Sequence, residues 1–148
     1  MNTKLNDKFR SELIGSDAIR QYIFGGHGVV TLLSDVSNEH HTYSFSVPEN
    51  RKPNDDTMFI YTLVDGSNWV YVGMYRNKAF RLTAKSNYST DTSIVKGIAY
   101  IFKLMLNPDF SDDRMHLFHE GICSRCGRPL TNPISIRLGI GPTCMEKL

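Results

Sequence analysis

The sequence predicts an α+β fold in which one long helix packs on a twisted antiparallel sheet, with a small zinc-binding module at the C-terminus. Three observations lead to this prediction. Short runs with strand-like patterns fill the first half of the chain, an apolar stripe at helical spacing follows them, and all three cysteines come after residue 120. We therefore expect an α+β domain over residues 1–110 and a zinc module over residues 111–148, packed on that domain.

A short helix is predicted near the N-terminus, after about ten polar residues. Ser16 is a suitable N-cap, and Ile19, Tyr22 and Ile23 have the spacing of one helical face. The Gly25-Gly26 pair would end this helix.

The segment after Gly28 has the pattern of successive strands separated by turn-forming residues. In residues 41–47, Tyr43, Phe45 and Val47 would face one side, and the intervening serines the other. The predicted strands cover residues 29–33, 41–47, 57–64, 69–74 and, as a short fifth strand, 80–83. We expect these four or five strands to form the antiparallel sheet.

The long helix is predicted from a cap at Thr90 or Asp91 to about Leu106. Apolar residues recur there at helical spacing and form a wide stripe, and Asn107-Pro108 would end the helix. This stripe would supply half of the core.

Composition excludes several classes of protein. With 41% hydrophobic and 22% charged residues, the chain resembles neither a disordered nor a fibrous protein. The longest apolar stretch, residues 94–106, contains two lysines and is too short to span a bilayer. The N-terminus has no apolar signal region, so we expect a cytoplasmic protein without membrane contact.

The cysteine spacing predicts one structural zinc ion bound by His119, Cys123, Cys126 and Cys144. A Cys-x-x-Cys pair lets two thiolates reach one ion from a tight turn, and Gly127 allows the left-handed backbone that directs amides at the sulfurs. Three thiolates and one imidazole form a closed tetrahedral shell, which is the structural pattern and leaves no position for an activated water.

Two alternatives bear on this site. A Cys-x-x-Cys pair can be a redox pair, but that reading requires a parallel βαβ context, which the pattern here does not predict. His116 could replace His119 as the fourth ligand. If this segment is extended, the two histidines face opposite sides, and His119 is the nearer to the cysteines.

The run from Cys123 to Cys144 closely resembles an uncharacterised zinc-ribbon-like domain that is frequent in bacteriophage and mobile-element proteins. The shared pattern is Cys-x-x-Cys-Gly-Arg-x-Leu-Thr, then Pro-x-Ser, then Gly-Ile-Gly-Pro-x-Cys, often with a preceding histidine, here His119. The family usually has an acidic residue where this chain has Ile134. Looser matches upstream extend the resemblance over most of the chain. It implies a phage-type origin, hence a host-cell cytoplasm, and no assigned reaction.

Charge distribution suggests what the protein binds. Residues 71–103 contain six bases and one acid, although the net charge is only +2. We find no nucleophile or acid–base set beyond the cysteines assigned to metal, so we expect a protein that is not an enzyme. The first hypothesis is a nucleic-acid-associated module, with Tyr75, Phe80 and Tyr88 available to stack on bases or to pack in the core. The residues expected to contact nucleic acid or another partner are Arg76, Lys78, Arg81, Lys85, Arg125, Arg128 and Arg137.

Two other functions are compatible with the same sequence. The chain could be a phage-encoded inhibitor that binds a host protein, such as a component of a defence system, because segregated charge suits electrostatic steering to a partner. It could also sequester a small nucleotide on the sheet. The sequence does not predict an oligomeric state.

Overall fold

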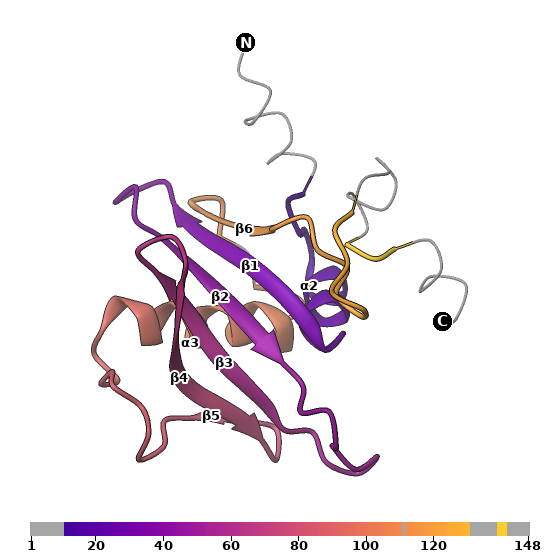
Figure 1. The fold of residues 1–148 in the computed structure, drawn as a ribbon. Coiled ribbons are helices and arrows are strands. Elements are labelled where there is room, and N and C mark those ends of the chain that lie inside the picture. The colour runs from indigo at the N-terminus through magenta and orange to yellow at the C-terminus, as the bar shows by residue number, and fades with distance from the viewer. Residues whose placement is uncertain (1–10, 111, 131–138, 142–148) are drawn as a thin grey trace.

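A computed structural model describes residues 11–110, 112–130 and 139–141 (Figure 1). Within these residues it confirms the α+β class: a six-stranded antiparallel sheet curls into a half-barrel, accompanied by two helices. The strand order is β5-β4-β3-β2-β1-β6. The elements are α2 (Ser16–Ile23), β1 (His27–Ser34), β2 (His40–Ser46), β3 (Met58–Val64), β4 (Asn68–Arg76), β5 (Ala79–Arg81), α3 (Ser93–Leu106) and β6 (Met115–His119).

The sheet contains six strands, whereas the sequence predicts four or five. The additional strand, β6, pairs antiparallel with β1 from Val30↔His119 to Ser34↔Met115. It lies within the range assigned to the zinc module, so the sheet runs directly into that module. The segment has only five residues and includes two histidines but no β-branched residue, which leaves no clear strand signal.

The helix starts differ slightly from the predicted ones. Gly15 is the N-cap of α2, and Ser16 is its first residue. In α3 the cap is Thr92, whose hydroxyl accepts a hydrogen bond from the Val95 amide at 3.4 Å, one or two residues after the predicted position. Both helices end close to where they were expected, at Ile23 and Leu106.

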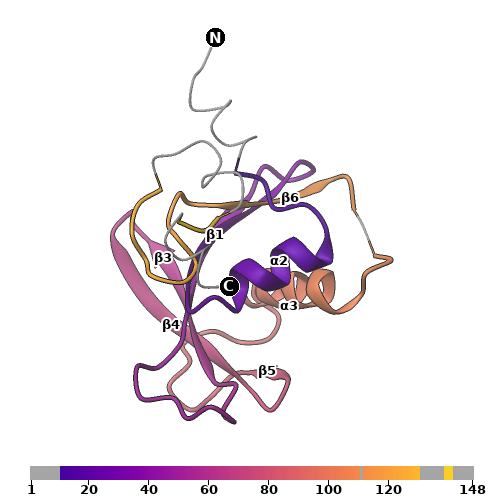
Figure 2. The same ribbon diagram turned by 90° about the vertical axis from the view of Figure 1, so that its right-hand side faces the viewer.

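Both helices lie on the same face of the sheet (Figure 2). The core is formed between α3 and alternate strand residues such as Tyr43 and Phe45, which are fully buried. The Tyr43 hydroxyl donates to the Ile94 carbonyl at 2.8 Å and so ties β2 to the first turn of α3. The helix can approach this closely because Gly97 has no side chain.

Tyr75 and Phe80 are part of this core. Their rings stack on Phe102 of α3 at centroid distances of 5.2 and 5.9 Å, and Tyr88 packs against the same cluster. Of the two roles left open for Tyr75, core packing is the one observed, because its ring is buried on the helix side of the sheet. None of the helices in the described part of the chain is long and apolar enough to cross a membrane.

Candidate metal centre

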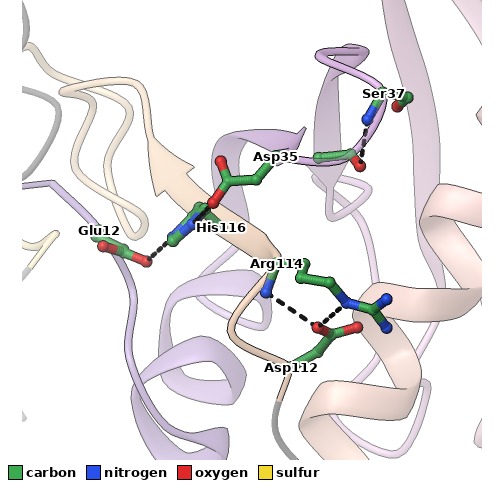
Figure 3. A network of polar contacts seen from close by, with 7 residues as sticks. Glu12, Asp35, Ser37, Asp112, Arg114 and His116 are labelled. Carbon is green, nitrogen blue, oxygen red and sulfur yellow. Dashed lines mark hydrogen bonds and ion pairs between the residues drawn. The ribbon is translucent and has the colours of Figure 1, made fainter.

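The two candidate histidines lie on opposite faces of β6. His119 is 1% exposed and its ring contacts Tyr22 of α2 edge-on at 5.3 Å. His116 instead stacks near Phe118, and its two ring nitrogens hydrogen-bond to Glu12 at 2.8 Å and Asp35 at 2.7 Å (Figure 3). Hydrogen bonds to these two carboxylates raise the pKa of His116. Both ring nitrogens of His116 are engaged by carboxylates, so His116 could bind zinc only by breaking one of these hydrogen bonds.

The segment after β6 folds into a small hairpin, which we call the knuckle (residues 121–130). The Cys123 amide donates to the Arg128 carbonyl at 2.9 Å, and the Leu130 amide donates to the Gly121 carbonyl at 2.8 Å. At the turn, the Gly127 amide donates to the Cys123 carbonyl at 2.9 Å. Gly127 has φ +77°, the left-handed conformation that the sequence analysis attributed to it.

Hydrogen-bond donors surround the sulfur of Cys123. The Gly141 amide donates to Cys123 Sγ at 3.2 Å, and the amides of Arg125 and Cys126 together with the Cys126 thiol also stabilise the thiolate. Burial raises the pKa of the Cys123 thiol, but these hydrogen bonds outweigh it and lower the pKa to about 7. The thiolate is the form that binds metal, so this environment prepares Cys123 as a ligand.

The knuckle is attached to the domain at the turn between α2 and β1. The His27 amide donates to the Ser124 carbonyl at 2.7 Å, and the Tyr22 hydroxyl donates to the Ile122 carbonyl at 2.8 Å. Gly25 lies so close that a Cβ there would be 2.6 Å from Ser124 Oγ. These contacts fix the position of the two cysteines relative to α2.

The short segment Gly139–Gly141 joins the knuckle to His119. The Ser124 amide donates to the Gly139 carbonyl at 3.0 Å. A Cβ at Gly139 would lie 3.6 Å from Cδ2 of the His119 ring, and Gly141 contacts the Cys123 sulfur as described. The histidine and the first cysteine are thus linked through a segment that is close to Cys144 in sequence.

The donor set fits zinc in its chemistry, with two thiols and an imidazole close in sequence. Within residues 11–110, 112–130 and 139–141, no group of three or more His, Cys, Asp or Glu side chains lies close enough together to hold a metal ion. Cys144 lies outside the described residues. His119 Nδ1 accepts a hydrogen bond from the Gly121 amide at 3.1 Å. Zinc binding through Nδ1 would use the same lone pair, and zinc binding through Nε2 would leave a proton on Nδ1, so either mode would break this hydrogen bond. The four-ligand zinc site therefore stays a prediction.

The basic residues fall into two groups on different parts of the sheet. Arg76, Lys78 and Arg81 are exposed around the β4–β5 hairpin, and Lys85 follows it. Arg125 and Arg128 are exposed in the knuckle beside the opposite edge strand, β6 (Figure 1). Arg137 lies outside the described residues. The described basic residues that the sequence predicts as contacts thus lie at the two edges of the sheet.

An aromatic group that the sequence did not single out lies on the sheet face opposite the helices. Phe59 and Tyr61 of β3 alternate with the fully buried Met58 and Ile60, so their rings point away from the core. Tyr71 of β4 contacts both rings. The alternation within residues 58–61 indicates that Phe59 and Tyr61 share one face of the strand. It does not indicate which face is buried, because all four residues are apolar or aromatic.

Comparison with known proteins adds one finding. Residues 114–148 match the model of a family described as a family of unknown function (DUF6011). The close pair Cys123 and Cys126 lies within the matched segment. No curated protein and no solved structure matches the chain.

Proposed function

We propose that this chain is a non-catalytic nucleic-acid-binding protein whose C-terminal module is held together by one structural zinc ion. The zinc assignment is supported by the amides and thiol directed at the Cys123 sulfur, an arrangement that favours the metal-binding thiolate. His119, Cys126 and Cys144 would complete the shell. Such a shell is closed, so the ion would stabilise the fold and would not activate water.

The observation that carries the nucleic-acid assignment is the cationic β4–β5 hairpin. Arg76, Lys78 and Arg81 project from six consecutive residues, and no carboxylate of the described residues forms an ion pair with them. Asp56 accepts hydrogen bonds from the backbone amides of Asn77 and Lys78 at 2.8 and 2.9 Å, so its charge stabilises the turn. Asp55 interacts electrostatically with Arg76, whereas the exposed side chains of Lys78 and Arg81 stay available for phosphates.

Arg76 is also held in position. Its Nε donates to Thr57 Oγ1 at 2.8 Å, and the Thr57 hydroxyl in turn donates to Asp55. A preorganised guanidinium presents its remaining N–H groups to a phosphate with a smaller loss of side-chain entropy than a free one. This arrangement suits contact with a phosphate backbone.

Salt-dependent binding tests the proposal. We expect the zinc-loaded protein to bind a labelled oligonucleotide with an affinity that falls steeply as salt rises, because counterions are released from the phosphates. Lys78→Glu and Arg81→Glu should weaken binding and flatten the salt dependence. Lys96→Glu is the matched control, since it changes the charge equally but lies on α3, on the other face of the sheet.

Binding that is absent or insensitive to salt would contradict the nucleic-acid assignment. In that case the alternative of an inhibitor that binds a host protein becomes the better explanation for the charged hairpin. A complex recovered from host lysate that survives nuclease treatment would support that alternative.

A further inference from the structure

We infer that the sheet face opposite the helices binds single-stranded nucleic acid by stacking its bases on Tyr61, Tyr71 and Trp69. We call this surface, formed by Phe59, Tyr61, Trp69 and Tyr71, the aromatic face. The inference rests on the proposed function and assigns its nucleic-acid ligand and contact surface.

The fold leaves this surface uncovered by either helix. Both α2 and α3 pack on the side of Met58 and Ile60, and the aromatic face belongs to the opposite side of β3 and β4 (Figure 2). These two strands lie between β5 and β2 in the sheet and pair from Met58↔Tyr75 to Val64↔Asn68. The surface is therefore a broad part of the sheet and not a narrow edge.

Three of the four rings form a connected group. Tyr71 lies opposite Tyr61 in the register, with ring centroids 5.8 Å apart, and its ring centroid is 6.4 Å from that of Phe59. Trp69 lies opposite Leu63 on the same face and is 43% exposed. The Tyr71 hydroxyl is 3.1 Å from Thr83 Oγ1, a hydrogen bond that restrains its ring. Restrained, partly exposed rings are suited to stacking, which tolerates any base sequence.

The charge of the surface matches a phosphate backbone. The register Phe59↔Met74↔Arg81 places Arg81 on the same face as the aromatic group, and Arg76 follows Met74 by two residues on that face. Strands β2, β3, β4 and β5 contain no Asp or Glu. A backbone that crosses the aromatic face would thus meet two arginines at β4–β5 and no carboxylate from these four strands.

A single strand fits this surface better than a duplex does. Stacking on a protein ring requires a base face that is not already covered by its neighbours, and a duplex hides these faces within its own stack. A sheet with aromatic residues on its central strands and basic residues at its side presents both contacts to the same extended strand.

Trp69 provides a direct measurement, because it is the single tryptophan of the chain. We expect its fluorescence to be quenched when the zinc-loaded protein is titrated with single-stranded DNA or RNA, and to change little with the same sequence as a duplex. Tyr61→Leu should lower single-strand affinity about tenfold, whereas Tyr61→Phe, which keeps the ring, should bind like the unmodified protein. Thermal unfolding of both variants shows whether they are folded.

The possible outcomes separate this inference from the proposed function. If Arg81→Glu weakens binding but Tyr61→Leu and Trp69→Leu do not, the protein binds nucleic acid through its charges alone and the inference is wrong. If neither single strand nor duplex binds, both the inference and the proposed function fail. If sedimentation shows a dimer that Trp69→Leu dissociates, a second copy covers the aromatic face, and the inference is again overturned.

Discussion

At the scale of single residues, the environment of each ionisable side chain determines its role. Cys123 and His116 are only seven positions apart, yet their surroundings favour opposite charges. Amides surround the sulfur of Cys123 and lower its pKa to about 7, which favours the anion. Two carboxylates hold the ring of His116, raise its pKa and favour the cation. The first residue is suited to metal binding and the second to an ion pair.

His116 should stabilise the protein in a pH-dependent way. Because its pKa is raised in the folded state, its contribution is fully present below the unfolded value of about 6.5 and is lost as pH rises through the folded pKa. We expect His116→Ala to lower the free energy of unfolding by roughly 0.5–1 kcal/mol at about pH 5.5 and by less at about pH 9, since the group is partly exposed.

Denaturant unfolding at both pH values measures this difference. His40→Ala is the matched control, because His40 is an exposed histidine for which the described residues show no ion pair. An equal loss at both pH values for His116→Ala would show that the ion pairs with Glu12 and Asp35 do not contribute.

At the scale of the elements, the close approach of α3 to β2 depends on one glycine. A Cβ at Gly97 would lie 2.3 Å from the Tyr43 hydroxyl oxygen and 3.3 Å from the ring carbon that carries it. The first contact is impossible without movement, and the Tyr43 hydroxyl is held by the Ile94 carbonyl. The glycine therefore allows the helix to approach this closely, despite its poor helix propensity.

A double-mutant cycle tests this packing. We expect Gly97→Ala alone to lower the free energy of unfolding by about 1–3 kcal/mol, as overpacked cores do. In the Tyr43→Phe background the clashing oxygen is gone, so Gly97→Ala should be close to neutral, helped by the roughly 1 kcal/mol helix preference of alanine. Equal effects of Gly97→Ala in both backgrounds, measured by thermal or denaturant unfolding, would contradict the assigned contact.

How much of the fold could be predicted differs between elements. The stripe of α3 and the alternation of residues 41–47 were sufficient, because each pattern is local and contrasts apolar with polar positions. Strand β6 could not be found this way, since its pairing with β1 joins residues more than 80 positions apart and its own pattern is short. The sequence around Tyr75 does not indicate which face of the sheet its side chain occupies.

In the candidate metal site too, local features could be predicted from the sequence and long-range contacts could not. The turn at Gly127 was predictable, because the Cys-x-x-Cys-Gly sequence alone requires a tight left-handed turn. The attachment of the knuckle to α2 was not, since the contact between Tyr22 and Ile122 joins residues 100 positions apart. The pairing of His116 with Glu12 and Asp35 was equally out of reach, although it bears directly on which histidine can bind metal.

At the scale of the whole molecule, the sheet and the knuckle form a continuous structure. Strand β6 enters the knuckle directly, and the knuckle contacts the α2–β1 turn through Ser124 and Gly25. The knuckle itself buries few apolar side chains, so a metal ion would supply stability that its small core cannot. We therefore expect zinc removal to destabilise this part of the molecule first and the sheet only secondarily.

A zinc count on gently purified protein by native mass spectrometry, before and after treatment with a chelator, tests the zinc module most directly. We expect one zinc ion per chain. The ion should be lost in Cys123→Ser, Cys144→Ser and His119→Ala and retained in His116→Ala. Protein that carries no zinc, or that retains it in Cys123→Ser, would contradict the claim that this C-terminal segment is a structural zinc module.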